Sequence, residues 1–84
     1  MMKLYQAEWC PYCARVRSRM TDLCLAYINV NVPHSKAART ELIKVSGQAG
    51  IPTLVDGDVM IADDDDAIID YLNRTYGKSA TEKL

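Results

Sequence analysis

Two cysteines, Cys10 and Cys13, are the residues whose type and spacing most clearly predict chemistry. They enclose Pro11 and Tyr12 and directly precede a segment with helical periodicity. Residues three apart on a helix share one face, with Cβ atoms roughly 5–6 Å apart, whereas a disulfide needs about 3.8 Å. A small adjustment of the first helical turn would therefore form or break the bond. The pair predicts a dithiol that cycles between reduced and oxidised forms.

Cys10 is the predicted attacking thiol because it stands at the start of the predicted helix. Free N–H groups and the helix dipole at that end favour an anion, and the thiolate is the nucleophilic form of cysteine. Cys13 lies a turn deeper, so we expect it to be more shielded and placed to resolve a mixed disulfide at Cys10. Arg15, one turn on, either adds positive potential or points to water.

The alternative interpretations are an inert buried pair and half of a zinc site. Zinc needs four ligands, and the other candidates in the chain are Cys24 and His34. On a continuous helix Cys24 would lie about 16 Å from Cys13, which excludes both a shared metal and a disulfide between them. We therefore expect no metal, with Cys24 in the core or at a helix end and His34 exposed in a turn.

The composition indicates one ordinary globular domain. The chain has 84 residues, of which 49% are hydrophobic and 25% charged, and its formal net charge is −1. We expect residues 1–77 to form the domain and residues 78–84 a polar tail. The charge balance favours neither nucleic acid nor an anionic membrane surface as a partner, and no apolar run approaches the roughly 20 residues that span a bilayer.

The cysteine count and the N-terminus predict a cytoplasmic protein. Three cysteines are an odd and small number for a structural disulfide framework. Residues 1–8 lack the continuous apolar stretch of a secretory signal. We therefore expect a reducing, cytoplasmic environment, and we expect a monomer.

Strand-like and helical patterns alternate along the chain. In order, they predict a strand over 3–7, a helix over 11–24, a strand over 26–32, a helix opened by Pro33 and Ser35 and stopped by Gly47, strands over 53–55 and 59–61, and a helix after the acidic run 63–66 that ends near Gly77. Helical spacing predicts Ala38, Leu42, Ile43 and Val45 as the buried positions of the second helix.

These elements predict an α/β fold in the order βαβαββα. The first two strands are joined across a helix, so they must be parallel, whereas Asp56-Gly57 is a strong signal for an antiparallel hairpin. We expect a four-stranded mixed sheet with three helices, distributed over both faces.

The chain resembles a glutaredoxin over nearly its whole length. The resemblance depends on the order of elements, on Trp9-Cys10-Pro11-Tyr12-Cys13, on Ile51-Pro52-Thr53 and on the acidic run before the last helix. Residues 51–72 also resemble the N-terminal domain of glutathione S-transferases. Both families share the thioredoxin-like fold. The resemblance implies a thiol–disulfide oxidoreductase that uses glutathione as reductant, a milder reductant than thioredoxin, with catalytic residues Cys10 and Cys13.

The same resemblance implies a glutathione site made of Tyr12, Ile51, Pro52, Asp64 and Asp65. In glutaredoxins the matching proline is cis, and the backbone of the residue before it holds the cysteinyl unit like an added strand. The pair matching Asp64 and Asp65 grips the γ-glutamyl group, with Asp65 as the acid. Aspartates here also fit a helix cap, so we expect Asp65 to bind and the other acids to cap or face water. Tyr12 either contacts the substrate or is simply exposed.

The chain departs from the glutaredoxin pattern around this site. A lysine is replaced by Ala7, which Glu8 follows; the usual Gly-Gly is Ala62-Asp63; and a common threonine is Gly50. Gln48 falls where a polar or basic residue is frequent, and Arg39 would replace the missing lysine if the second helix faced the groove. These changes weaken the expected glutathione contacts but leave the thiol chemistry intact.

The resemblance implies disulfide-containing or glutathionylated proteins as substrates, with a glutathione or thioredoxin reductase system as electron source. One alternative is a small redoxin reduced by thioredoxin reductase. A second is a non-enzymatic module that binds glutathione or bridges an iron–sulfur cluster through Cys10 of two chains. A third is a transferase fragment, but 84 residues leave no room for the helical domain of transferases, so we expect conjugation of a chlorinated aromatic to fail.

Overall fold

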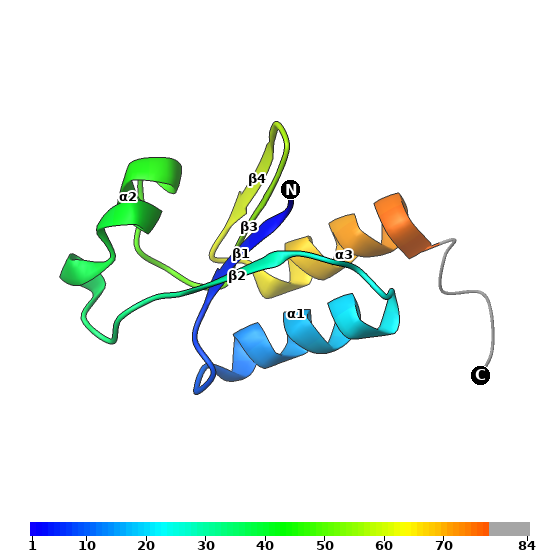
Figure 1. Ribbon diagram of the computed structural model, residues 1–84, viewed down its shortest axis with the longest axis horizontal. Coiled ribbons are helices and arrows are strands. Elements are labelled where there is room, and N and C mark those ends of the chain that lie inside the picture. The colour runs from blue at the N-terminus through cyan, green and yellow to red at the C-terminus, as the bar shows by residue number, and fades with distance from the viewer. Residues whose placement is uncertain (78–84) are drawn as a thin grey trace.

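The computed structural model describes residues 1–77, so the predicted tail at 78–84 lies outside the described residues. The elements follow in the order β1 (Lys3–Gln6), α1 (Pro11–Asp22), β2 (Ile28–Asn31), η1 (Lys36–Ala38), α2 (Thr40–Ser46), β3 (Thr53–Asp56), β4 (Val59–Ala62) and α3 (Asp65–Tyr76) (Figure 1). Apart from the short 3-10 helix η1, this is the predicted order βαβαββα.

The four strands form one mixed sheet in the order β2-β1-β3-β4. β1 and β2 are parallel, as their connection through α1 requires, and the other two pairs are antiparallel. In the hairpin, Asp56 pairs with Val59, and Gly57 adopts a left-handed conformation with φ +61° that suits glycine. The predicted parallel pair and hairpin are therefore both confirmed.

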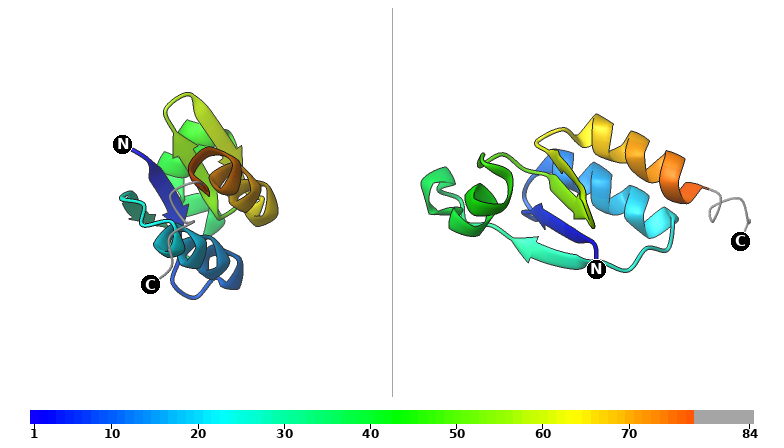
Figure 2. Two further views of the ribbon diagram at one scale, coloured as in Figure 1. Left: turned by 90° about the vertical axis from the view of Figure 1, so that its right-hand side faces the viewer. Right: turned by 90° about the horizontal axis from the view of Figure 1, so that it is seen from above.

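Helices α1 and α3 pack side by side over one face of the sheet (Figure 2). The buried cluster between them comprises Met2, Leu4, Val16, Met20, Leu23, Leu54, Ile68 and Leu72. Burying each large side chain of this kind contributes about 1.5–3 kcal/mol. Arg15 pairs with Asp65 near the starts of the two helices, and Arg19 bonds to Asn73 further along. The helices are therefore parallel, and their N-termini lie together at one end of the sheet.

Helix α2 covers the other face only in part. Leu42 is buried there against Tyr5, but Ala38 is exposed in η1, and Ile43 and Val45 are 39% and 44% exposed. The prediction that Ala38, Ile43 and Val45 are buried is therefore wrong. The physical reason is length: α2 begins only at Thr40, so two turns present a single residue to the sheet.

Helix α1 ends earlier than predicted. Its last residue is Asp22, and Cys24 adopts a left-handed conformation with φ +55° before the chain turns towards β2. Cys24 is exposed, so of the two expected positions it takes the helix end and not the core. β2 is correspondingly shorter than the predicted strand over 26–32.

Asp56 of β3 holds the C-terminal end of α3 against the sheet. This carboxylate accepts a hydrogen bond from Tyr71 at 2.6 Å and another from Tyr76. The two hydroxyls, Tyr71 first, hold the pKa of Asp56 below its ordinary value, and the carboxylate raises the pKa of Tyr76 to about 12. The helix is thus tied to β3 at its C-terminus and to α1 at its N-terminus.

Candidate active site

Cys10 is the N-cap residue of α1. Its backbone is extended, with φ −84° and ψ 116°, and its sulfur accepts the N–H of Cys13 with 3.3 Å between sulfur and nitrogen. Pro11 follows at the first helical position, where its missing N–H would have no helical partner. The first turn of α1 holds no acidic residue. A negative charge on the Cys10 sulfur therefore faces free N–H groups and no opposing carboxylate in that turn.

Cys13 lies beneath Cys10 with no exposed surface, whereas Cys10 is 5% exposed. Both are free thiols. Burial, followed by the hydrogen bond with Cys10, raises the pKa of Cys13 to about 12. Cys13 is therefore a protonated thiol near neutral pH, which favours Cys10 as the nucleophile of the pair.

A groove of about 210 Å³ opens beside the dithiol, lined by Tyr12, Ile51, Pro52, Asp63 and Asp65. Ile51 shares a buried cluster with Cys10 and Cys13, so the thiols adjoin one wall of this groove. The Ile51–Pro52 bond is cis, as the glutaredoxin resemblance implies. The structure thus brings together four of the five residues predicted to bind glutathione and leaves out Asp64.

Asp64 is instead the N-cap residue of α3. Its carboxylate accepts the N–H of Ala67 at 3.0 Å. This contact satisfies one of the free N–H groups at the start of the helix. The side chain of Asp64 therefore has a structural partner and does not line the groove.

Arg15 joins the starts of the two helices. Its guanidinium pairs with Asp65 and, at 2.9 Å, with Asp66. These carboxylates, Asp66 first, raise the pKa of Arg15. The Arg15 side chain is 53% exposed, so it faces water in part, as one of the two expected positions has it. Its charge pairs with Asp65 and Asp66 and so partly neutralises the acidic run.

Asp63 is the groove residue that the sequence prediction missed. It has a left-handed backbone with φ +53°, and its N–H donates to the Pro52 carbonyl at 2.9 Å. Its side chain fills the space that a Cβ at Gly50 would occupy. Two departures from the glutaredoxin pattern, Gly50 and Asp63, are therefore in contact. The presence of both departures in one chain was the signal that could have indicated this contact, but the sequence alone does not show that Gly50 and Asp63 lie close together.

Arg39 and Gln48 do not compensate for the missing lysine. Arg39 is buried and donates to the carbonyls of Pro33, His34 and Ala49. The Gln48 side chain accepts the Gly50 N–H at 2.6 Å and donates to the hydroxyls of Ser46 and Thr53. The suggestion that Arg39 replaces the lysine is wrong, because its guanidinium is committed to holding loops together.

Trp9 and His34 form a contact that the sequence did not reveal. Their rings are stacked with centroids 4.5 Å apart and an interplanar angle of 11°. His34 is exposed as expected, and Trp9 is 52% exposed. An aromatic pair therefore stands directly before Cys10 in the chain, held from the loop between β2 and η1.

Within residues 1–77, no group of three or more His, Cys, Asp or Glu side chains is arranged to hold a metal ion. In the same part of the chain, the helices are all too short or too polar to cross a membrane.

The sheet order, the helix arrangement and the capped dithiol define a thioredoxin-like domain. The family model for the glutathione S-transferase N-terminal domain matches residues 4–80. The chain belongs to this family of glutathione S-transferase N-terminal domains.

Curated relatives confirm the glutaredoxin resemblance. A glutaredoxin-like 8.6 kDa protein from the rubredoxin operon of Clostridium pasteurianum is 27% identical over 62 residues, which cover 73% of this chain and 83% of that protein. A putative glutaredoxin of Mycobacterium tuberculosis is 32% identical over 54 residues, which cover 63% of this chain and 64% of that protein. Glutaredoxin 3 of Escherichia coli K12 is 28% identical over 53 residues, with coverages of 63% and 64%.

Solved structures of transferases share the fold. Glutathione transferase E6 of Drosophila melanogaster superposes with a TM-score of 0.78 at 32% identity, and isozyme E7 with 0.80 at 33%. A transferase of the Antarctic clam Laternula elliptica gives 0.81 at 25%. These matches cover 90–93% of this chain, which spans only 35–36% of the transferases' own length.

Proposed function

We propose that the protein is a glutathione-dependent thiol–disulfide oxidoreductase that reduces protein disulfides and glutathione mixed disulfides through Cys10 and Cys13. The observation that carries this proposal is the pairing of a sulfur at the helix N-cap with a fully buried thiol whose pKa is raised to about 12. The glutaredoxin and transferase relatives support a thiol-oxidoreductase role of this kind.

In the proposed cycle the thiolate of Cys10 attacks one sulfur of the substrate disulfide. A new S–S bond joins Cys10 to that half, and the other half leaves as a thiolate that takes a proton from water. Cys13 then attacks the Cys10 sulfur and releases the bound half as a thiol; alternatively, a glutathione thiol attacks the sulfur of the bound half, forms a disulfide with it and releases the Cys10 thiolate. If Cys13 attacked, two glutathiones reduce the Cys10–Cys13 disulfide and leave as glutathione disulfide.

The charge on Cys10 controls when Cys13 can react. Both the hydrogen bond with Cys10 and the proximity of its charge contribute to the raised pKa of Cys13. A mixed disulfide at Cys10 removes that charge, so the Cys13 proton is lost more easily at this stage. Burial, the largest cause, remains. Cys13 therefore stays inert before the first exchange and becomes more reactive after it.

The groove beside Ile51 and Pro52 is the proposed glutathione site. The Ile51 backbone would hold the cysteinyl unit, as an added strand is held. The Asp65 carboxylate, already paired with Arg15, would hold the γ-glutamyl ammonium, and free N–H groups at the start of α3 would take the neighbouring carboxylate. Tyr12, which is 59% exposed, would form the outer rim. Asp64 would contribute by fixing the first turn of α3.

The proposed partners are glutathione and proteins that carry disulfides or glutathionylated cysteines. The proposed compartment is the cytoplasm, where reduced glutathione returns the dithiol to its starting state.

The deciding experiment compares electron sources. The oxidised protein is incubated with NADPH and either glutathione plus glutathione reductase or thioredoxin reductase alone, and NADPH consumption is followed. We expect turnover of the mixed disulfide between hydroxyethanethiol and glutathione only with the glutathione system. Turnover with thioredoxin reductase alone would instead establish a small redoxin, and no turnover with either would refute the proposed activity.

The transferase family match favours a second candidate function, conjugation of glutathione to an electrophile. This is tested by adding glutathione and a chlorinated nitrobenzene and recording the conjugate absorbance. Conjugation without disulfide reduction would assign the groove to transfer and not to exchange.

A further inference from the structure

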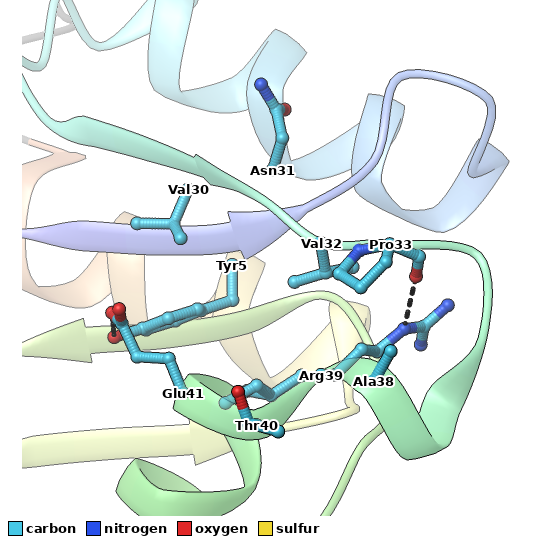
Figure 3. A pocket seen from close by; sticks show the side chains of 10 residues that line it. Tyr5, Val30, Asn31, Val32, Pro33, Ala38, Arg39, Thr40 and Glu41 are labelled. Carbon is cyan, nitrogen blue, oxygen red and sulfur yellow. Dashed lines mark hydrogen bonds between the residues drawn. The ribbon is translucent and has the colours of Figure 1, made fainter.

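Arg39 is a buried cation whose side chain bonds only to backbone oxygens among the described residues. It is 5% exposed. Its Nε donates to the Pro33 carbonyl at 2.8 Å, one terminal nitrogen to the Ala49 carbonyl at 2.8 Å, and the other to the His34 carbonyl at 3.2 Å. Figure 3 shows the side chain turned towards Pro33 beneath the loop after β2. A buried charge is costly unless it is fully hydrogen-bonded, so these contacts fix the guanidinium.

The three carbonyls belong to two loops, the loop between β2 and η1 and the loop between α2 and β3, and each loop reaches the neighbourhood of the dithiol. On one side, the ring of His34 stacks on Trp9, the residue before Cys10. On the other side, Ala49 lies two residues before Ile51, which packs in one cluster with Cys10 and lines the groove. Arg39 therefore bridges the loop that holds Trp9 next to Cys10 and the loop that leads to the groove wall at Ile51.

The planar shape of the Arg39 guanidinium means that it can fix the orientation of the two loops as well as hold them together. A guanidinium is planar and holds five N–H donors in a fixed fork. Its bonds to Pro33, His34 and Ala49 therefore set the relative orientation of the two loops as well as their separation. A lysine ammonium is a point charge on a flexible stem and cannot reproduce this geometry.

We propose that Arg39 is a positioning residue for disulfide exchange. Its guanidinium holds Trp9, through His34, and Ile51, through Ala49, in the mutual arrangement that receives a substrate disulfide at Cys10. The proposal rests on the proposed function and adds to it a residue that touches neither the thiols nor the groove.

The first test compares Arg39→Lys and Arg39→Met with Arg74→Met. Arg74 is a matched control because it is an exposed arginine on α3 that pairs only with Asp70 among the described residues. KM and kcat for the mixed disulfide of glutathione are measured for each variant. We expect both Arg39 variants to raise KM by about tenfold or more, because small misplacements of a binding wall weaken productive binding strongly. We expect Arg74→Met to match the wild type.

The second test uses Trp9 as a reporter, because it is the only tryptophan of the chain. His34→Ala removes the stacked ring and defines the fluorescence of an unstacked Trp9. We expect Arg39→Met to shift the Trp9 emission in the same direction. The double variant with both His34→Ala and Arg39→Met should shift the emission no further than the single variant that has the larger shift. Arg74→Met should leave the emission unchanged.

The third test uses Arg39→Ala and measures whether guanidinium, added at millimolar concentration, restores its function. We expect partial recovery of both the KM and the Trp9 emission, and we expect no response of Arg74→Met.

Two outcomes would contradict an account of this kind. If the Arg39 variants lower only the melting temperature and keep the wild-type KM and emission, Arg39 is not a positioning residue. If the wild type reduces no disulfide, the proposed function fails, and the Trp9 emission still decides whether Arg39 orders the loop.

Discussion

The starts of α1 and α3 are two helix N-termini with the same pattern of capping hydrogen bond and different chemistry. At α1 the sulfur of Cys10 accepts the N–H three residues on, at 3.3 Å. At α3 the carboxylate of Asp64 accepts the N–H three residues on, at 3.0 Å. The first turn of α3 adds two acids that pair with Arg15, whereas the first turn of α1 has none.

The difference shows how one feature of helices serves two purposes. The carboxylate cap at α3 forms no covalent bond in the proposed cycle, so its effect is on stability. A sulfur at the same position is charged only as a thiolate, and that charge disappears when the sulfur forms a covalent bond. In the proposed function, the helix end of α1 would stabilise a reactive state, while that of α3 stabilises the fold and one side of the groove.

The largest expected effect separates the two cysteines of α1. Cys10→Ser should abolish reduction of the hydroxyethanethiol–glutathione mixed disulfide, because a serine hydroxyl is not a nucleophile towards disulfides here. Cys13→Ser should retain much of the activity, because glutathione can resolve the intermediate. Serine is also a good N-cap, so unfolding in urea should show little loss of stability for Cys10→Ser. Equal loss of activity in both variants would contradict the assigned roles.

The next effect concerns Cys13 and pH. Because its pKa is raised to about 12, Cys13 should resist iodoacetamide at pH 9 in the folded protein, while the exposed Cys24 is modified. Peptide mapping by mass spectrometry measures this. The unfolded state loses the Cys13 proton at lower pH than the folded state, so this thiol should also reduce stability as pH rises above about 9. Modification of Cys13 as fast as Cys24 would show that it is neither buried nor held protonated.

A smaller effect is expected at the cap of α3. Asp64→Ala should lower the free energy of unfolding by about 0.5–2 kcal/mol, and Asp64→Asn by much less, because asparagine also caps well. Urea denaturation of both variants gives the comparison. If the two variants were equally destabilised, the negative charge, and not the hydrogen bond to Ala67, would be the source of the stability.

The smallest expected effect is at Arg15. Arg15→Gln removes the pairs with Asp65 and Asp66, but Arg15 is largely exposed, and surface pairs contribute little. We expect Arg15→Gln to lower the free energy of unfolding by less than Asp64→Ala does. We also expect the difference between Arg15→Gln and the wild type to disappear in added salt. A loss that persists in 1 M salt would mean that the pair is shielded from water. Arg19→Gln, which removes a more distant contact between the same helices, is the control.

The sequence predicted the elements whose signals are local. A cysteine pair before helical periodicity, β-branched residues in alternation and an Asp56-Gly57 turn each act within a few residues. For that reason, the sheet, α1 and the hairpin follow from the sequence. The cap role of the acidic run was also expected in part, since Asp64 caps and Asp65 lines the groove.

The segment 33–50 could not be predicted in the same way. Arg39 bonds to three carbonyls of this segment, which lie five, six and ten residues away in the sequence. Periodicity assigned Ile43 and Val45 to the core because it cannot show that α2 has only two turns. The contacts of Gly50 with Asp63 and of Trp9 with His34 are likewise long-range pairings, which composition and spacing do not encode.

The most direct measurement is the mass of the covalent intermediate in the Cys13→Ser, Cys24→Ser double variant after exposure to glutathione disulfide. In this variant the Cys10 sulfur should carry one glutathione, which dithiothreitol should release. The Cys10→Ser, Cys24→Ser double variant should carry no glutathione. A glutathione on Cys13 in that second variant, or no adduct in the first, would contradict the assignment of Cys10 as the attacking thiol.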